Sequence, residues 1–129
     1  MASWDDLVSF VRVRYEIMRS SEAELWFNLP TTQERTQLVV VRHKADADGQ
    51  AWAQIESPIG RIADLDLPLL LAKASESVVG GVAAEDGVAL FRHSIPLHEG
   101  ELTGFDLPFR LVVKVADELE ELLTGKDEH

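Results

Sequence analysis

Asp46 and Asp48, two residues apart and followed by Gly49, have the spacing found in the middle of a calcium-binding loop. Such a loop needs an oxygen ligand at its first position and a bidentate glutamate at its twelfth position. In this chain Lys44 occupies the first position and Ile55 the twelfth. The stretch therefore predicts a hairpin turn and not a calcium site.

A histidine-based metal site is the second chemistry to weigh. His93, His98 and Glu99 are close in sequence. Residues five apart on a strand face opposite sides, and Pro96 interrupts the strand between the two histidines. A zinc site with three ligands would also need His43, which no local spacing brings near. We expect neither a metal nor another cofactor.

The sequence contains no motif typical of covalent or acid–base catalysis. The chain has no cysteine and no G-x-S-x-G elbow, and Gly80-Gly81 lacks a phosphate-binding pattern. The adjacent carboxylates Glu85/Asp86 and Glu120/Glu121 are typical of a turn and of a solvated helix face. We predict that the protein is not an enzyme. The alternative is a small-molecule binder or enzyme whose groups converge only in space, in a pocket between sheet and helices.

The composition is that of an acidic globular domain. The 129 residues are 46% apolar and carry a formal net charge of −11, from 23 acidic and 12 basic residues. This length suits a single domain, which we assign to residues 1–125, followed by a short charged tail at 126–129. A negative field repels phosphate groups, so we expect no nucleic-acid partner. The charge either serves solubility or forms a chaperone-like surface.

Neither a signal peptide nor a membrane span is predicted. The first ten residues, MASWDDLVSF, place two aspartates where a signal peptide carries Lys or Arg. The longest apolar run, Leu67–Ala72, is far shorter than the ~20 residues of a membrane-spanning helix. We therefore expect a cytoplasmic protein with no membrane partner.

Three helices are predicted, over residues 4–19, 67–79 and 107–124, from apolar residues at helical spacing. The second and third follow the same phrase, Asp-Leu-Pro, at Asp66 and at Asp106. Aspartate accepts hydrogen bonds from the free N–H groups of a first helical turn, and proline in that turn loses no helical bond. Both aspartates are therefore predicted helix starts.

Five strands are predicted from alternating apolar residues and turn signals. Asp48-Gly49 and Asp86-Gly87 are typical hairpin turns, and each lies between two strands. The predicted strands are 23–29, 37–44, 50–57, 82–85 and 88–95. The fold class is therefore α+β, a five-stranded antiparallel sheet with three helices in the order α-β-β-β-α-β-β-α.

Three stretches carry a family resemblance: Leu69–Ala74 (LLLAKA), Val88–Leu97 (VALFRHSIPL) and Ala116–Leu119 (ADEL). With the order of elements, they resemble the class I type III secretion chaperones and the related YbjN-like family of small bacterial proteins. The resemblance implies a homodimer that binds another polypeptide and catalyses nothing. It covers nearly the whole chain, although its motifs are short.

The second predicted helix is apolar on two sides. One stripe is the expected core face: Leu67, Leu70, Leu71, Ala74 and Val78. Leu69, Ala72 and Val79 fall on the other side of the helical wheel. This second side is buried either under a crossing helix or against a second copy of the chain, and we favour the dimer interface.

Trp26 and Trp52 lie on the more polar side of their strands, where large aromatic residues either pack over a sheet rim or bind partners. We assign them to partner binding. The predicted function is a non-catalytic homodimeric module that holds a partner polypeptide on apolar surface patches. A deep cavity with convergent polar groups would favour the small-molecule alternative instead.

Overall fold

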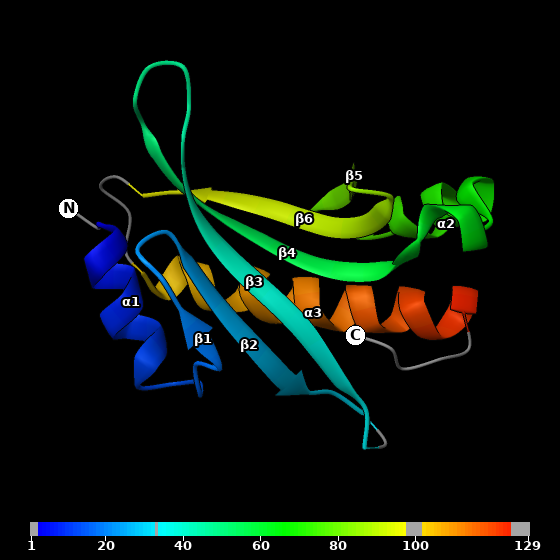
Figure 1. The fold of residues 1–129 in the computed structure, drawn as a ribbon, viewed down its shortest axis with the longest axis horizontal. Coiled ribbons are helices and arrows are strands. Elements are labelled where there is room, and N and C mark those ends of the chain that lie inside the picture. Colours follow the sequence, from blue (N-terminus) through cyan, green and yellow to red (C-terminus); the bar gives the residue numbers. More distant parts are fainter. Residues whose placement is uncertain (1–2, 33, 98–101, 125–129) are drawn as a thin grey trace.

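The computed structural model describes residues 3–32, 34–97 and 102–124 as an α+β fold with one antiparallel sheet (Figure 1). The α-helices are α1 (Trp4–Arg12), α2 (Leu67–Ala74) and α3 (Thr103–Thr124), and a short 3₁₀ helix, η1, spans Ile62–Asp64. The strands are β1 (Arg19–Ser20), β2 (Glu24–Pro30), β3 (Thr36–Ala45), β4 (Ala51–Arg61), β5 (Gly81–Glu85) and β6 (Val88–Pro96). Figure 1 shows α3 along one face of the sheet, with α1 and α2 at opposite ends of the molecule.

The sheet has six strands in the order β1-β2-β3-β4-β6-β5, and all neighbours are antiparallel. The predicted sheet class is confirmed, whereas the predicted number of five strands is wrong. The additional strand is β1, which pairs Arg19 with Trp26 and Ser20 with Leu25. Both β1 residues are exposed and polar, so no apolar alternation marks them as a strand.

Helix α1 ends earlier than predicted, at Arg12 instead of residue 19. Ser3 caps it as expected, in a capping box with Asp6. At the other end Val13 is 79% exposed, and the Met18 N–H already donates to the carbonyl of Trp26 in β2. The apolar residues of the predicted last turns therefore belong to a connection that leads into β1.

The two Asp-Leu-Pro phrases have different structural roles. Asp66 is the N-cap of α2 and accepts a hydrogen bond from the Leu69 N–H at 3.1 Å, as predicted. Asp106 lies inside α3, which begins at Thr103 and contains Pro108, so the predicted helix start at residue 107 is wrong. Helix α2 also ends at Ala74, short of the predicted residue 79. Helix α3 reaches Thr124, the predicted last residue of this helix. The predicted tail at 126–129 lies outside the described residues.

Both predicted hairpin turns are confirmed by strand pairing. Gly49 has φ +82° between β3 and β4, and Asp86 and Gly87 have φ +52° and +78° between β5 and β6. Positive φ at both Asp86 and Gly87 is what a type I′ hairpin turn requires. The β3–β4 loop is longer and spans residues 46–50, between the paired Ala45 and Ala51. The β3–β4 hairpin projects beyond the rest of the sheet (Figure 1).

Strand β4 continues through Pro58 to Arg61, although Pro58 was predicted to lie beyond the strand. Proline has no N–H for a ladder, and the β3–β4 pairing stops at Glu56. The fully buried Gln37 of β3 fills this gap, because its side-chain amide donates to Ser57 Oγ at 2.9 Å and to the Pro58 carbonyl at 2.7 Å. Side-chain bonds thus replace backbone bonds where the two strands separate.

The core lies between α3 and the facing side of the sheet. Sheet residues at alternate positions bury their side chains there, among them Phe27, Val39, Ile55 and Phe91. From α3, Phe105 stacks on Phe109 with ring centroids 5.1 Å apart, and Phe109 meets Phe27 at 5.3 Å. None of the helices in the described part of the chain combines the length and apolarity of a membrane-spanning segment.

Candidate binding cleft

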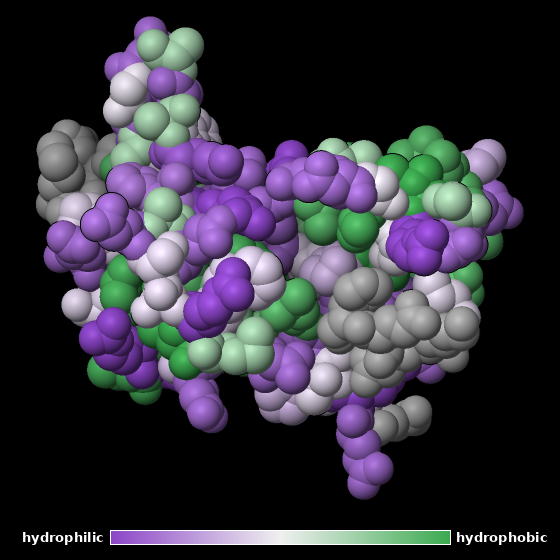
Figure 2. All heavy atoms as spheres, in the orientation of Figure 1, coloured by the Kyte–Doolittle hydropathy of each residue, from purple (hydrophilic) through white to green (hydrophobic). Residues whose placement is uncertain are grey.

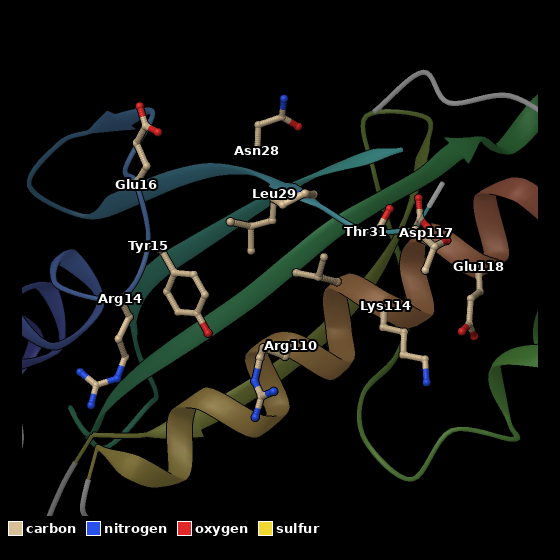
Figure 3. Close-up of a pocket in the computed structure, with 13 residues that line it drawn as sticks. Arg14, Tyr15, Glu16, Asn28, Leu29, Thr31, Arg110, Lys114, Asp117 and Glu118 are labelled. Atoms are coloured by element: carbon tan, nitrogen blue, oxygen red, sulfur yellow. The ribbon is translucent and has the colours of Figure 1, made fainter. Parts of the chain in front are cut away.

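A cleft of about 630 Å³ lies between the end of β2 and helix α3 (Figure 3). One wall consists of residues 14–16, which follow α1, and a second consists of residues 28–32, which close β2 and continue beyond it. Helix α3 supplies the opposite wall with Arg110, Val113, Lys114, Asp117 and Glu118. Tyr15, Leu29, Pro30 and Val113 give the cleft an apolar surface, and charged side chains of both signs surround it.

Tyr15 closes one end of the cleft. Its ring packs 4.9 Å from Phe109 and 6.2 Å from Phe27, measured between centroids. Its hydroxyl donates to the Asp106 carboxylate, which also accepts a hydrogen bond from Arg110 Nε at 3.0 Å. Burial, followed by the hydrogen bond and the charge of Asp106, raises the pKa of Tyr15 to about 12. The Tyr15 side chain is therefore neutral at physiological pH, and its contacts hold it in place as part of the cleft wall.

The other end of the cleft carries a partly buried ionic cluster. Arg35 Nε lies 3.1 Å from Asp117 Oδ1, and its guanidinium is 3.6 Å from Glu120 and 3.8 Å from Glu121. The side chains of Asp117 and Glu120 are 4% and 1% exposed. Among the described residues, one arginine thus meets three carboxylates at this end of the cleft.

Strand β2 has a free edge along the cleft. β1 pairs only with Leu25 and Trp26, so in the described chain residues 27–30 of β2 have a strand partner on the β3 side alone. The Trp26 carbonyl points away from β3, because it accepts from Met18 N–H. Backbone groups alternate along a strand, so Asn28, two residues on, also directs its N–H and C=O outwards. Asn28 lines the cleft, which therefore adjoins free backbone hydrogen-bonding groups.

The predicted dimer residues lie on α2 and in the segment that follows it, at the end of the molecule opposite α1 (Figure 1). Leu69 is 38% exposed, Ala72 is exposed and Val79, beyond the helix end, is half-buried. The predicted core stripe is wrong in part, because only Leu70 and Ala74 of it are buried. Its other members are exposed: Leu67 (40%), Leu71 (59%) and Val78 (100%). Figure 2 shows hydrophobic side chains gathered at this end.

Trp26 and Trp52 share the sheet face that points away from α3. The register pairs Trp26 with Val40 and places Trp52 opposite Lys44, four residues further along the same face of β3. Both tryptophans are half-buried and engaged within the chain. Trp26 Nε1 donates to Glu24 at 3.2 Å, and the Arg19 guanidinium lies 4.3 Å from the Trp26 ring. Trp52 Nε1 donates to the hairpin residue Asp46 at 2.9 Å.

An ion-pair row crosses the same sheet face and has no signature in the sequence. It takes one residue from each of five strands, with alternating charge: Glu24, Arg42, Glu56, Arg92 and Glu85. The central Glu56 is 4% exposed in its side chain and lies 2.7 Å from Arg42 Nε and 2.7 Å from Arg92 Nη2. Glu56 and Arg92 are 36 residues apart, and the other pairs join strands that are consecutive in the chain. The row as a whole depends on the strand register, which local spacing does not give.

The residues considered for metal binding are dispersed. The Asp46 carboxylate accepts hydrogen bonds from Trp52, Gln50 and Asp48, which hold its pKa below the usual range. His43 stacks on the Trp4 ring at 5.1 Å, and His93 Nδ1 accepts from the Gly80 N–H. His98 and Glu99 lie outside the described residues. Within 3–32, 34–97 and 102–124, no three histidine or acidic side chains form a group that could hold a metal.

Sequence reasoning did not find the cleft, because its walls come from three distant segments. The signal available in the sequence was indirect: Pro30 ends a strand, and polar residues follow it. Comparisons of the chain with protein-family models, with curated proteins and with solved structures give no match.

Proposed function

We propose that this protein is a non-catalytic, cytoplasmic, homodimeric module that binds a partner polypeptide, as its resemblance to the type III secretion chaperones and YbjN-like proteins implies. In this proposal the cleft between β2 and α3 holds an extended segment of the partner. The surface formed by Leu67, Leu69, Leu71, Ala72, Val78 and Val79, the α2 surface, faces a second copy of the chain.

The observation that carries the proposal is that the cleft follows a free strand edge. An extended polypeptide can donate to and accept from the outward backbone groups of Asn28, as strands do when they join an existing sheet. Leu29 and Val113 offer apolar contacts to its side chains on the α3 side. A groove with backbone pairing on one side and apolar contacts on the other suits a peptide chain.

The arrangement of polar groups favours a polypeptide over a small molecule. A volume of about 630 Å³ also lies in the range of small-molecule sites, which use a few convergent polar groups. Here Tyr15 and Arg110 both bind Asp106, and Asp117 binds Arg35. These groups satisfy one another and do not converge on one point in the cleft. The small-molecule function therefore remains the second candidate.

The α2 surface supports a homodimer. Leu67, Leu69 and Leu71 are large apolar residues exposed on a helix of eight residues, and exposed apolar patches of this kind mark interfaces. The neighbouring strand β5 is the last strand of the sheet and pairs with β6 alone. A two-fold axis at this end would bury the same surface on both copies.

Site-specific photocrosslinking in cells tests the function. A photoreactive amino acid at the exposed cleft residue Thr32 should capture polypeptides, whereas the same amino acid at the exposed residue Asp64 of η1 should not. Asn28→Pro removes the outward N–H without removing a bond to β3 and should reduce capture at Thr32. Asn28→Ala keeps the N–H and is the matched control. Equal capture at Thr32 and Asp64, or a small molecule in native mass spectra of the purified protein, would argue against the proposal.

A further inference from the structure

The charge on the α3 wall changes sign along the cleft. Arg110 lines the cleft near Tyr15 together with Arg14, and Lys114 follows one turn further along α3. At the Thr31 end the wall continues with Asp117 and Glu118. Figure 3 shows this order along α3, from Arg110 beside Tyr15 to Glu118.

Nearby charges preserve this change of sign. The half of the cleft lined by residues 14–16 and 110–114 has three cations, Arg14, Arg110 and Lys114, and two carboxylates accompany them, Glu16 in the wall and Asp106 paired with Arg110. In the half towards Thr31, the described charged side chains are Arg35 and four carboxylates: Asp117, Glu118, Glu120 and Glu121. Among the described residues, the half of the cleft towards Tyr15 is therefore net positive and the half towards Thr31 net negative, within a protein of net charge −11.

The spacing of the wall matches that of an added strand. Side chains on one face of a strand recur about every 6.7 Å, and residues four apart on a helix rise about 6 Å. Arg110, Lys114 and Glu118 are spaced four apart on α3. Figure 1 shows β2 inclined to α3, so a strand added beside β2 would cross the helix, and its cleft-facing side chains would meet different turns of the wall.

Asn28 and Pro30 fix which partner residues face this wall. Asn28 lies on the sheet face away from α3, so a residue paired with it also points away, and its two neighbours point into the cleft. Pro30 has no N–H and offers only its carbonyl, which limits the pairing to a short segment. Lys114 and Glu118 are exposed, and among the described residues neither makes an ion pair, so both are available to a ligand.

Resting on the proposed function, we infer that the cleft selects an extended segment of mixed charge. Its cleft-facing side chains run from acidic, beside Arg110 and Lys114, through apolar, beside Leu29 and Val113, to basic, beside Glu118. Net charge alone would favour a purely basic segment. The order of charges along the cleft favours the mixed one.

Synthetic peptides provide the probe. In each peptide, threonine alternates with three residues designed to face the cleft, and the central one of the three is leucine. The two outer residues are both aspartate, both lysine, or one of each. The mixed peptide is made in both sequence orders. We expect at least one mixed peptide to bind the wild type about three- to tenfold more tightly than either like-charged peptide, because exposed ion pairs contribute modestly. Asn28→Pro should weaken that binding and Asn28→Ala should not.

A charge reversal makes the test specific. Glu118→Lys should shift the preference towards the peptide with two aspartates, about three- to tenfold. Glu76→Lys makes the same charge change at an exposed site after α2 and should leave the preference unchanged. Tightest binding of the two-lysine peptide by the wild type, or equal shifts by both variants, would overturn the inference. If no peptide binds while the photoreactive residue at Thr32 still captures polypeptides, the inferred charge pattern alone is overturned. If the photoreactive residue at Thr32 captures no polypeptide, the result counts against the proposed function.

Discussion

Tyr15 and Asp106 are 91 residues apart in the chain, and the Tyr15 hydroxyl donates a hydrogen bond to the Asp106 carboxylate. The bond joins the connection between α1 and β1 to the first turns of α3. Arg110 fixes the same carboxylate from the other side through its Nε at 3.0 Å. One end of the cleft is thus built by a contact between the two ends of the described chain.

The Tyr15–Asp106 bond predicts an unusual titration. Tyr15 is the sole tyrosine, so tyrosinate absorbance reports it alone. We expect a midpoint near 12 in the folded protein and a lower one in Asp106→Asn, which loses the negative charge. The folded chain holds the phenol proton more tightly than the unfolded chain, whose pKa is about 10, so stability falls as pH rises from about 10 to 12. A wild-type midpoint at the ordinary value in a folded sample would contradict this.

Removal of Glu56 should destabilise the protein strongly. Glu56→Ala leaves Arg42 and Arg92 facing each other across β4 without the buried carboxylate, and breaking a buried ion pair in this way costs roughly 3 kcal/mol. Glu85→Gln removes the 50% exposed end of the same row and should cost less than about 1 kcal/mol. Urea unfolding monitored by circular dichroism measures both. Equal losses would show that Glu56 does not hold the row together.

Gly80 and Gly81 form a matched pair for a steric prediction. Gly80 has φ +76°, and a Cβ there would lie 2.6 Å from the Phe91 ring. Phe91 is fully buried, so Gly80→Ala should cost about 1–3 kcal/mol in strain and displaced packing. A Cβ on Gly81 meets nothing within 4 Å, so Gly81→Ala should be nearly neutral. Similar melting temperatures for the two variants would refute the assigned role of Gly80.

Local sequence patterns anticipated most elements because each depends on nearby residues. Ser3 with Asp6 and Asp66 with Leu69 are caps made within one turn, and Asp86-Gly87 is a turn defined by two residues. Asp106 shows the limit of such a pattern. Phe105, one residue before it, is 2% exposed, and burial of this ring accompanies a helix that begins before the aspartate.

The cleft and the ion-pair row depend on tertiary register, which no local pattern contains. Glu56 pairs with Arg92, which is 36 residues away in the chain, and Arg35 pairs with Asp117, which is 82 residues away. Alternation along the strands predicted which face of the sheet Trp26 and Trp52 occupy, and the strand register agrees. Their hydrogen bonds to Glu24 and Asp46 depend on side-chain conformation, which alternation does not predict. Their role in partner binding stays a prediction.

The proposed dimer can be tested at Leu69. Its side chain is partly packed, so burial of the remaining 38% would contribute about 1 kcal/mol per copy. Leu69→Glu would also bring two like charges together across the two-fold axis, and Leu71→Glu, at a more exposed site, should act in the same way. We expect both variants to remain folded by circular dichroism and to shift towards monomer in light scattering.

Leu107→Glu is the matched control for this experiment, because Leu107 is 57% exposed and belongs to the first turns of α3. The start of α3 lies at the end of the molecule away from α2 (Figure 1). Leu107→Glu adds the same charge to a chain of net charge −11 and should leave the oligomeric state unchanged. A wild type that is monomeric at high micromolar concentration would exclude the dimer. If Leu107→Glu dissociated the protein as strongly as Leu69→Glu, general charge repulsion, and not the α2 surface, would explain the shift.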